Sequence, residues 1–294
     1  MIRVLDAGLF TTVQDLGRPG LCHLGVSAAG AADPVSLRVA NRLVGNVESA
    51  AGLEMTLRGG RFEFLKDSWV SVCGGEFECS VPMWRAVWMR AGEQLSVGGC
   101  SRGARCYVAV RGGIDANYYL GSASTHVLSG FGGPVQKGTV LGLGICEVGE
   151  VSHDQISLGR PLDRVRVTLG AESDFFSARA MFTFLSQSWK VSEHSSRQGV
   201  WLRGGFVESP GDGVMESEGV ALGAVQVPPS GEPVILFVDS QTTGGYPVVA
   251  NVVGADVGVV GQLRPGWEFR FEAVSFDEAR RLLRQQEAWL RAPF

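Results

Sequence analysis

The sequence predicts a mostly β protein built as a barrel or a sandwich, because turn residues recur at short intervals along it. The 41 glycines of the 294 residues are spread along the chain rather than clustered. They separate short apolar runs with the length and composition of strands, namely Trp69–Cys73, Ala86–Met89, Cys106–Val110 and Val234–Val238. Three segments have helical spacing, so we expect a few short helices around the strands.

The three helix predictions rest on apolar spacing and on terminal signals. The first segment, 33–45, opens with an aspartate N-cap followed by proline and ends at a glycine. In the second, 173–187, apolar side chains recur near helical spacing. The third, 277–291, is preceded by Ser275-x-x-Glu278, which has the form of a capping box.

The polar stretch from Gly149 to Pro161 predicts a boundary between two β-rich halves. It contains two glycines and ends in proline, and a strand-like pattern starts afresh after it, at Val165–Leu169. We therefore expect an N-terminal half over 1–150 and a C-terminal half over 161–294, the latter with the C-terminal helix.

Composition and charge restrict the partners that this chain can have. The net charge is −4 and no run of five like charges occurs, so neither nucleic acid nor an anionic membrane is favoured. The N-terminus lacks the pattern of a secretion signal, and no 18-residue apolar stretch is present. We expect a cytoplasmic protein whose partners are small molecules and other proteins.

The cysteines, histidines and lysines lack the spacing of common cofactor sites. None of the six cysteines forms a C-x-x-C pair, so we expect reduced core thiols, and the four histidines are too scattered for a preformed metal site. The three lysines, Lys66, Lys137 and Lys190, fit neither a phosphate-binding P-loop nor the Met-Lys-Met setting of a biotinyl-lysine. We expect no biotin attached to this chain.

Four regions combine glycine with polar or ionisable side chains, as a site on the loops of a β scaffold requires. In chain order they are Leu9–Gly20 with His23 and Gly25–Asp33, then Arg111–Asp115 with Gly121–Thr125, then Glu216–Gly219 with Gln226–Pro229, and finally Asp239–Pro247. The last region is the most distinctive. Its Thr and Gln side chains and two glycine amides suit a flat amide or carboxylate, but they equally suit the backbone of a tight loop.

The other regions have structural alternatives of the same kind. Asp15 with Arg18 fits a structural ion pair as well as a pair in a site. Asp33 fits a helix cap, and Glu218 fits a solvated loop charge. The turn Arg111-Gly112-Gly113 fits an anion-binding turn, or a strand end where glycine permits close packing.

Five segments in order resemble a known family. They are Thr11–Gly20, Arg111–Asp115, Ser217–Gly219, Gln226–Pro229 and Gln241–Pro247. Together they resemble the family of C-type subunits of 5-oxoprolinase, also called KipA-like or allophanate hydrolase subunit 2, over nearly the whole chain. The resemblance implies a cyclophilin-like β-barrel architecture.

The resemblance also implies an enzyme subunit that works within a complex. Its expected partners are a KipI-like protein of the B type and a LamB/YcsF-like protein of the A type. With ATP bound at the level of the complex, the three would open L-5-oxoproline to L-glutamate. One alternative is a carboxyltransferase subunit that moves a carboxyl group from carboxybiotin to urea or a related amide. Another is a regulatory protein that binds a KipI-like kinase inhibitor.

Both enzymatic reactions need preorganised donors around a planar group whose oxygen gains negative charge. As catalytic candidates, Asp15 or Asp239 would orient the attacking water, Gln241 would hold the oxygen, and Arg18 would neutralise a transferred carboxylate. The substrate-binding candidates are Thr12, Gln14, His23, Asp33, Glu218, Gln226, Thr242, Thr243, Gly244, Gly245 and Tyr246.

One segment departs from the family pattern Gly-x-Pro-x-Ser-Gly-Ala-Met-Asp. Here Gly25–Asp33 lacks the proline, the serine and the methionine. A substrate contact from that serine hydroxyl cannot be made by Ala29, whereas Gly25, Gly30 and Asp33 keep the backbone features of the pattern. The departure bears on which substrate is bound.

Overall fold

The computed structural model describes residues 1–145, 149–156, 158–159 and 161–293. Strands predominate over helices in these residues, which confirms the mostly β prediction. No helix in the described ranges is long and apolar enough to cross a membrane.

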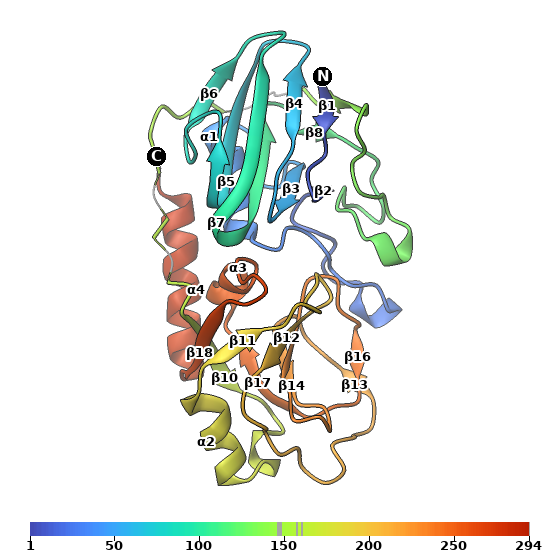
Figure 1. Cartoon of the computed structure of the whole chain (residues 1–294), viewed down its shortest axis with the longest axis vertical. Coiled ribbons are helices and arrows are strands. Elements are labelled where there is room, and N and C mark those ends of the chain that lie inside the picture. Colours follow the sequence, from blue (N-terminus) through green and yellow to red (C-terminus); the bar gives the residue numbers. More distant parts are fainter. Residues whose placement is uncertain (146–148, 157, 160, 294) are drawn as a thin grey trace. The chain divides into compact units, whose positions relative to one another are not determined.

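The chain folds into two compact units (Figure 1). One holds Met1–Arg18 and Ala29–Gly159, and the other holds Pro19–Ala28 and the C-terminal half up to Arg291. The N-terminal unit therefore differs from the predicted half 1–150, because Pro19–Ala28 groups with the C-terminal unit. No change of composition marks this short segment in the sequence.

The N-terminal unit is built on one sheet, which has nine strands within the described residues. The strand order is β2-β3-β7-β4-β1-β9-β8, and β5 pairs with both β7 and β6. The strands are β1 (Ile2–Asp6), β2 (Phe10–Gln14), β3 (Gly52–Thr56), β4 (Arg61–Phe64), β5 (Ser68–Cys79), β6 (Ala86–Met89), β7 (Gln94–Val110), β8 (Ile114–Asp115) and β9 (Val140–Leu143).

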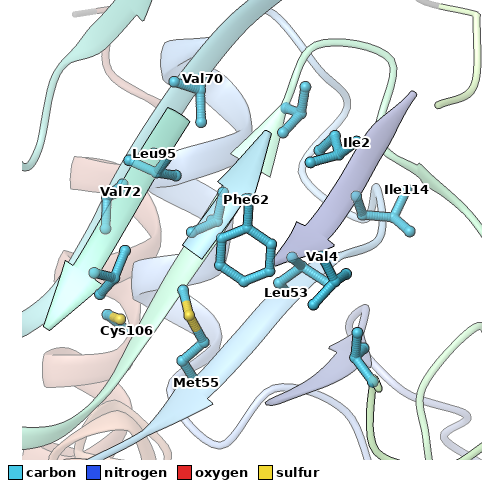
Figure 2. Close-up of a cluster of buried hydrophobic side chains, with 14 of the residues drawn as sticks. Ile2, Val4, Leu53, Met55, Phe62, Val70, Val72, Leu95, Cys106 and Ile114 are labelled. Carbon is cyan, nitrogen blue, oxygen red and sulfur yellow. The ribbon is translucent and has the colours of Figure 1, made fainter. Parts of the chain in front are cut away.

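The long strands β5 and β7 remain paired because glycine accommodates their irregular register. The pairing shifts after Gly74, which has a φ of +133°. A Cβ atom there would lie 2.4 Å from the carbonyl oxygen of Arg105 on the facing strand, so no other residue fits without a backbone shift. Apolar side chains from these strands and their neighbours form the core drawn in Figure 2, among them Val70, Leu95 and Cys106.

Helix α1 (Pro34–Leu43) confirms the first helix prediction and packs on β5 and β7. The Asp33 carboxylate accepts from the backbone N–H of Ser36 at 3.2 Å and from its hydroxyl at 2.5 Å, as an N-cap should. On the sheet side, the Ser71 hydroxyl donates to the carbonyl oxygen of Ala40 at 2.6 Å.

The C-terminal unit contains a closed barrel, which confirms the barrel prediction. Its strand order is β10-β17-β14-β15-β12-β11-β18. These strands are β10 (Arg164–Leu169), β11 (Trp189–Val191), β12 (Gly199–Arg203), β14 (Ala224–Gln226), β15 (Val234–Leu236), β17 (Val248–Val252) and β18 (Glu268–Ala273). A separate two-stranded ribbon pairs β13 (Glu218–Gly219) with β16 (Thr243–Gly244).

The other helix predictions hold in part. The segment 173–187 begins with a 3-10 turn, Ser173–Phe175, and α2 (Ala178–Ser186) starts only after Ser177, whose hydroxyl caps it. Two further helices follow, a short α3 (Val257–Val260) and the C-terminal α4 (Phe276–Arg291). At the start of α4 the backbone N–H of Glu278 donates to the Ser275 hydroxyl at 3.2 Å, which is one of the two bonds of the expected capping box.

Candidate functional site

Asp15 lies at the centre of a buried polar cluster in the N-terminal unit. Its Oδ1 accepts from the hydroxyls of Ser122 and Ser124, at 2.6 and 2.5 Å. The backbone N–H groups of Gly17 and Ala123 donate to Oδ1 and Oδ2, at 2.7 and 2.8 Å. Four donors thus surround a carboxylate that is 6% exposed, an arrangement that satisfies its acceptor positions and fixes the loop.

The two serines were missed from the sequence, although Gly121–Thr125 was singled out as a segment. They lie more than 100 residues from Asp15 in the chain, and only the fold brings them to it. Serine hydroxyls next to a turn carry no local pattern, so a pair of this kind is found only from the tertiary structure.

Arg18 extends the same cluster and is 2% exposed. Its Nε donates to the carbonyl oxygen of Tyr119 at 3.2 Å, and its Nη2 donates to the carbonyl oxygen of Ser124. The guanidinium carbon also lies 5.2 Å from the centre of the Phe131 ring, a cation–π distance. Arg18 therefore fastens the 119–131 loop to the Asp15 turn. Its predicted role in neutralising a carboxylate stays a prediction.

Thr12 and Gln14 are buried next to this cluster on β2. The Gln14 Nε2 donates to the Thr12 hydroxyl at 3.1 Å and to the carbonyl oxygen of Thr125 at 3.2 Å. The Gln14 Oε1 is buried and has no hydrogen-bond partner among the described residues. An acceptor left in this state is costly, so the position suits an additional donor such as an ordered water.

A second buried network holds the segment Ala29–Asp33. The Glu54 Oε2 accepts from the Tyr107 hydroxyl and from the backbone N–H of Ala32, both at 2.8 Å. The Tyr107 hydroxyl in turn accepts from the backbone N–H of Asp33 at 2.7 Å. Burial, and next the negative charge of Glu54, raise the pKa of Tyr107 well above its ordinary value.

The backbone conformation of the turn at Ala29–Ala31 explains why the departures from the family pattern are compatible with the fold. Ala29 has a φ of +51° and Gly30 a φ of +89°, so the turn itself is set by backbone conformation. Ala31 donates its N–H to the carbonyl oxygen of Asp15 at 2.9 Å. The turn is therefore positioned by backbone contacts that do not require the absent serine or methionine.

In the C-terminal unit, the third and fourth predicted regions lie side by side. Glu218 pairs with Gly244 and Gly219 pairs with Thr243 in the two-stranded ribbon. The backbone N–H of Met215 also donates to the carbonyl oxygen of Gly245 at 2.8 Å. The side chains of Glu218, Gln241, Thr243 and Tyr246 are exposed on this loop pair, whereas Thr242 is partly buried.

Buried side chains hold this exposed loop at both ends. Gln226, 1% exposed, donates from Nε2 to the carbonyl oxygen of Tyr246 at 3.0 Å, and a Cβ atom on Gly244 would lie 2.5 Å from that nitrogen. At the other end, the Asp239 carboxylate receives two hydrogen bonds from Arg197, Nε at 2.8 Å and Nη2 at 3.0 Å. Gln226 thus holds the loop backbone at Tyr246, and the pair of Asp239 with Arg197 fixes its other end. The direct roles of Gln226 and Asp239 with substrate stay predictions.

The predicted residues fall into two sets, one in each unit. Thr12, Gln14, Asp15, Arg18 and Asp33 belong to the N-terminal unit, and the other candidates belong to the C-terminal unit. His23 is exposed in a 3-10 turn, Cys22–Leu24, within the segment that groups with the C-terminal unit. No group of three or more His, Cys, Asp or Glu side chains suited to a metal ion occurs in the described part of the chain.

Comparison with known proteins identifies the family. The sequence model of the carboxyltransferase domain, subdomains A and B, matches residues 24–273. The chain belongs to this carboxyltransferase domain family. The matched range contains the loop of the C-terminal unit and the Ser122–Ser124 side of the Asp15 cluster, but not Thr12–Arg18. The match agrees with the resemblance found in the sequence.

The similar proteins include single subunits and parts of long enzymes. The chain is 34% identical to the C subunit of 5-oxoprolinase from Escherichia coli, over 98% of this chain and 96% of that protein. It is 36% identical to the corresponding C subunit from Haemophilus influenzae, over 99% and 96%. The crystal structure of the K. lactis urea amidolyase matches 99% of this chain with a TM-score of 0.90 and 30% identity, but only 20% of that longer chain is covered.

Proposed function

We propose that this chain is the C subunit of an ATP-dependent 5-oxoprolinase that opens L-5-oxoproline to L-glutamate. One observation carries the proposal: the chain matches two proteins that bear this name almost end to end, at 34 and 36% identity. We further propose that it works in the cytoplasm with a KipI-like protein of the B type and a LamB/YcsF-like protein of the A type.

The exposed loop Gln241–Tyr246 is the part of this chain that we propose to contact the substrate. Gln241 and Thr243 offer neutral donors at its surface, and the buried contacts of Gln226 and Asp239 hold the backbone in place. Donors fixed in this way suit an amide oxygen that gains negative charge as the lactam opens. ATP belongs to the complex in this proposal, because the chain offers no lysine in a glycine-rich phosphate loop.

Omission of single subunits from the complex tests the proposal. Glutamate formation from 5-oxoproline and ATP is measured with this chain and its two companion proteins, and then with each omitted in turn. We expect activity that requires this chain and that falls at least about tenfold in Gln241→Ala, because one donor to the developing oxyanion is lost. Full activity of the mixture without this chain would remove the assignment, and full activity of Gln241→Ala would remove the role of the loop.

A carboxyltransferase is the second candidate, favoured by the family and by the fold match to urea amidolyase. In that reaction the same loop would hold the ureido oxygen of biotin carried by another protein. The discriminating measurement is carboxyl transfer from carboxybiotin to urea by the same complex, without 5-oxoproline. Transfer in the absence of any glutamate formation would replace the first proposal by the second.

A further inference from the structure

Glu172 is the buried carboxylate that receives the fewest hydrogen bonds in the described part of this chain. It accepts one, from the backbone N–H of Val248 to its Oε2 at 3.0 Å. Every other buried carboxylate of the described residues accepts at least two. These are Asp15, Asp33, Glu54, Asp239 and Asp256.

The second oxygen of Glu172 is available to a ligand. Oε1 has no partner among the described residues, and no arginine, lysine or histidine among them forms an ion pair with this carboxylate. Unlike the Gln14 Oε1, it is not a buried atom sealed from solvent without a partner, so it reaches the surface. A carboxylate that is 9% exposed has lost much of its hydration, and a donor from outside the chain would restore part of what is lost.

The backbone around Glu172 is held without help from its side chain. Glu172 precedes the 3-10 turn Ser173–Phe175, but its carboxylate makes no capping hydrogen bond there. The Gly170 N–H donates to the carbonyl oxygen of Val249 at 3.0 Å, where strand β10 ends beside β17 (Figure 1). A Cβ atom on Gly170 would lie 2.1 Å from the carbonyl oxygen of Val248, so the two segments are in close contact. The carboxylate therefore starts from a fixed position.

That position is beside the loop that we propose to contact the substrate. Val248 begins β17 two residues after the loop Gln241–Tyr246 ends. Two residues span at most about 7 Å, so the carboxylate bonded to the Val248 N–H lies within about 10 Å of the Tyr246 backbone. Between them, the carbonyl oxygen of Pro247 accepts from the Val227 N–H at 3.0 Å. The loop thus has neutral donors on it and a charged acceptor at its end.

A lactam has the hydrogen-bonding groups that match these features. Its ring holds the amide in the cis form, so the carbonyl oxygen and the N–H lie on the same edge of the ring. The oxygen needs donors, which Gln241 and Thr243 offer, and the N–H needs an acceptor, which Glu172 offers. When the ring opens, the nitrogen becomes an amine that takes up a proton, and a carboxylate holds an ammonium group more strongly than a neutral N–H.

We propose that Glu172 is the acceptor for the lactam N–H of the substrate, with Oε2 held by Val248 and Oε1 directed to the ligand. The inference rests on the proposed function and adds to it a residue that selects amides carrying an N–H. Asp239, in the same unit, uses both of its oxygens on Arg197, whereas Glu172 has one oxygen left for the ligand.

Glu172→Gln tests the contact with little change of shape. The one oxygen of the glutamine has to accept from the Val248 N–H, so its NH2 group faces the lactam N–H and a donor meets a donor. We expect the KM of the complete complex for 5-oxoproline to rise at least about tenfold, with an unchanged melting temperature of the chain. Glu193→Gln removes the same charge from an exposed glutamate of the same unit and should behave like the wild type.

A lactone ligand separates direct contact from a structural effect. In the lactone analogue of 5-oxoproline a ring oxygen replaces the N–H, and its inhibition constant is compared with the KM for the lactam. The wild-type complex should bind the lactone at least about tenfold more weakly than the lactam, because Glu172 then faces an acceptor. In Glu172→Gln this preference should be lost, since the NH2 group opposes the lactam N–H but not the ring oxygen.

The outcomes separate this inference from the proposed function. If Glu172→Gln weakened lactam and lactone equally, the carboxylate would be a structural support and the inference would be overturned. Equal binding of the two ligands by the wild-type complex would overturn it without any variant. In both cases the wild type still makes glutamate, so the proposed function would stand. A complete wild-type mixture that makes no glutamate would remove the proposed function, and the inference with it, because the lactam would not be the ligand.

Discussion

The Asp15 cluster and the Asp239–Tyr246 loop contain the same kinds of residue but use them differently: one bonds them within the fold, and the other exposes them to solvent. Both combine a carboxylate, hydroxyls and glycines near a strand end. In the first, four donors from this chain surround the carboxylate, so its acceptor positions are used within the fold. In the second, the carboxylate lies at one end, bound by Arg197, and the side chains of Gln241, Thr243 and Tyr246 face solvent.

The difference shows that the partners of a polar residue decide its role, whatever the motif to which it belongs. A carboxylate whose hydrogen bonds are made within the fold stabilises the fold. Donors that are held in position but left exposed are available to a ligand. The cluster in the N-terminal unit supports its own loop, and the expected roles of Asp15 and Arg18 with substrate stay predictions. The loop in the C-terminal unit is the better candidate for contact with substrate.

The largest expected effect comes from removing the Asp15 carboxylate. Asp15→Ala leaves two buried hydroxyls and a buried N–H without their acceptor, which we expect to lower the free energy of unfolding by at least about 4 kcal/mol. Urea unfolding measures the loss. Asp212→Ala is the control, because that carboxylate is exposed and accepts from the neighbouring backbone N–H of Val214. A folded Asp15→Ala protein as stable as Asp212→Ala but inactive in the complex would make Asp15 a catalytic group.

The buried pair of Arg197 and Asp239 should give the next largest effect. Arg197→Met leaves the Asp239 carboxylate buried without its partner, at a cost of about 3 kcal/mol. Replacing both, as Arg197→Met/Asp239→Leu, should restore most of that stability, because no unpaired charge remains. Urea unfolding of the four proteins of this cycle measures the coupling. Additive losses would show that the two side chains do not act as a pair, and that the loop has another support.

Local signals in the sequence predicted a good part of this structure. The Asp33-Pro34 start of α1 and the Ser275 cap of α4 were found because a helix end is determined by the few residues that follow it. The frequent turns predicted a β architecture, because a turn is also determined by a few neighbouring residues and the turns separate short apolar runs of strand length. The four regions proposed for the site also proved to be brought together in pairs, Thr12–Arg18 with Gly121–Thr125, and Glu218–Gly219 with Thr243–Gly244.

Contacts between residues that are distant in the chain could not be predicted from such local signals. Glu54 and Tyr107 lie inside strands β3 and β7, where neither interrupts the strand pattern, yet together they hold the Ala32–Asp33 backbone. Arg197 likewise lies 42 residues before the aspartate that it binds. Apolar periodicity predicts which face of a strand is buried, but it does not predict which buried polar groups meet.

The smallest of these effects tests whether the exposed loop is held in its conformation by Gln226. Gly244→Ala would place a Cβ atom 2.5 Å from the Gln226 Nε2 and 3.2 Å from a Val220 methyl, which we expect to cost about 1–2 kcal/mol and to displace the loop. Gly219→Ala on the facing strand is the control, since its Cβ would have no atom within 4 Å. If the loop contacts substrate, Gly244→Ala should raise the KM of the complex for 5-oxoproline while Gly219→Ala leaves it unchanged. Equal kinetic behaviour of the two variants would show that the position of this loop does not matter for the reaction, and the site would then have to be sought in the residues of the other unit.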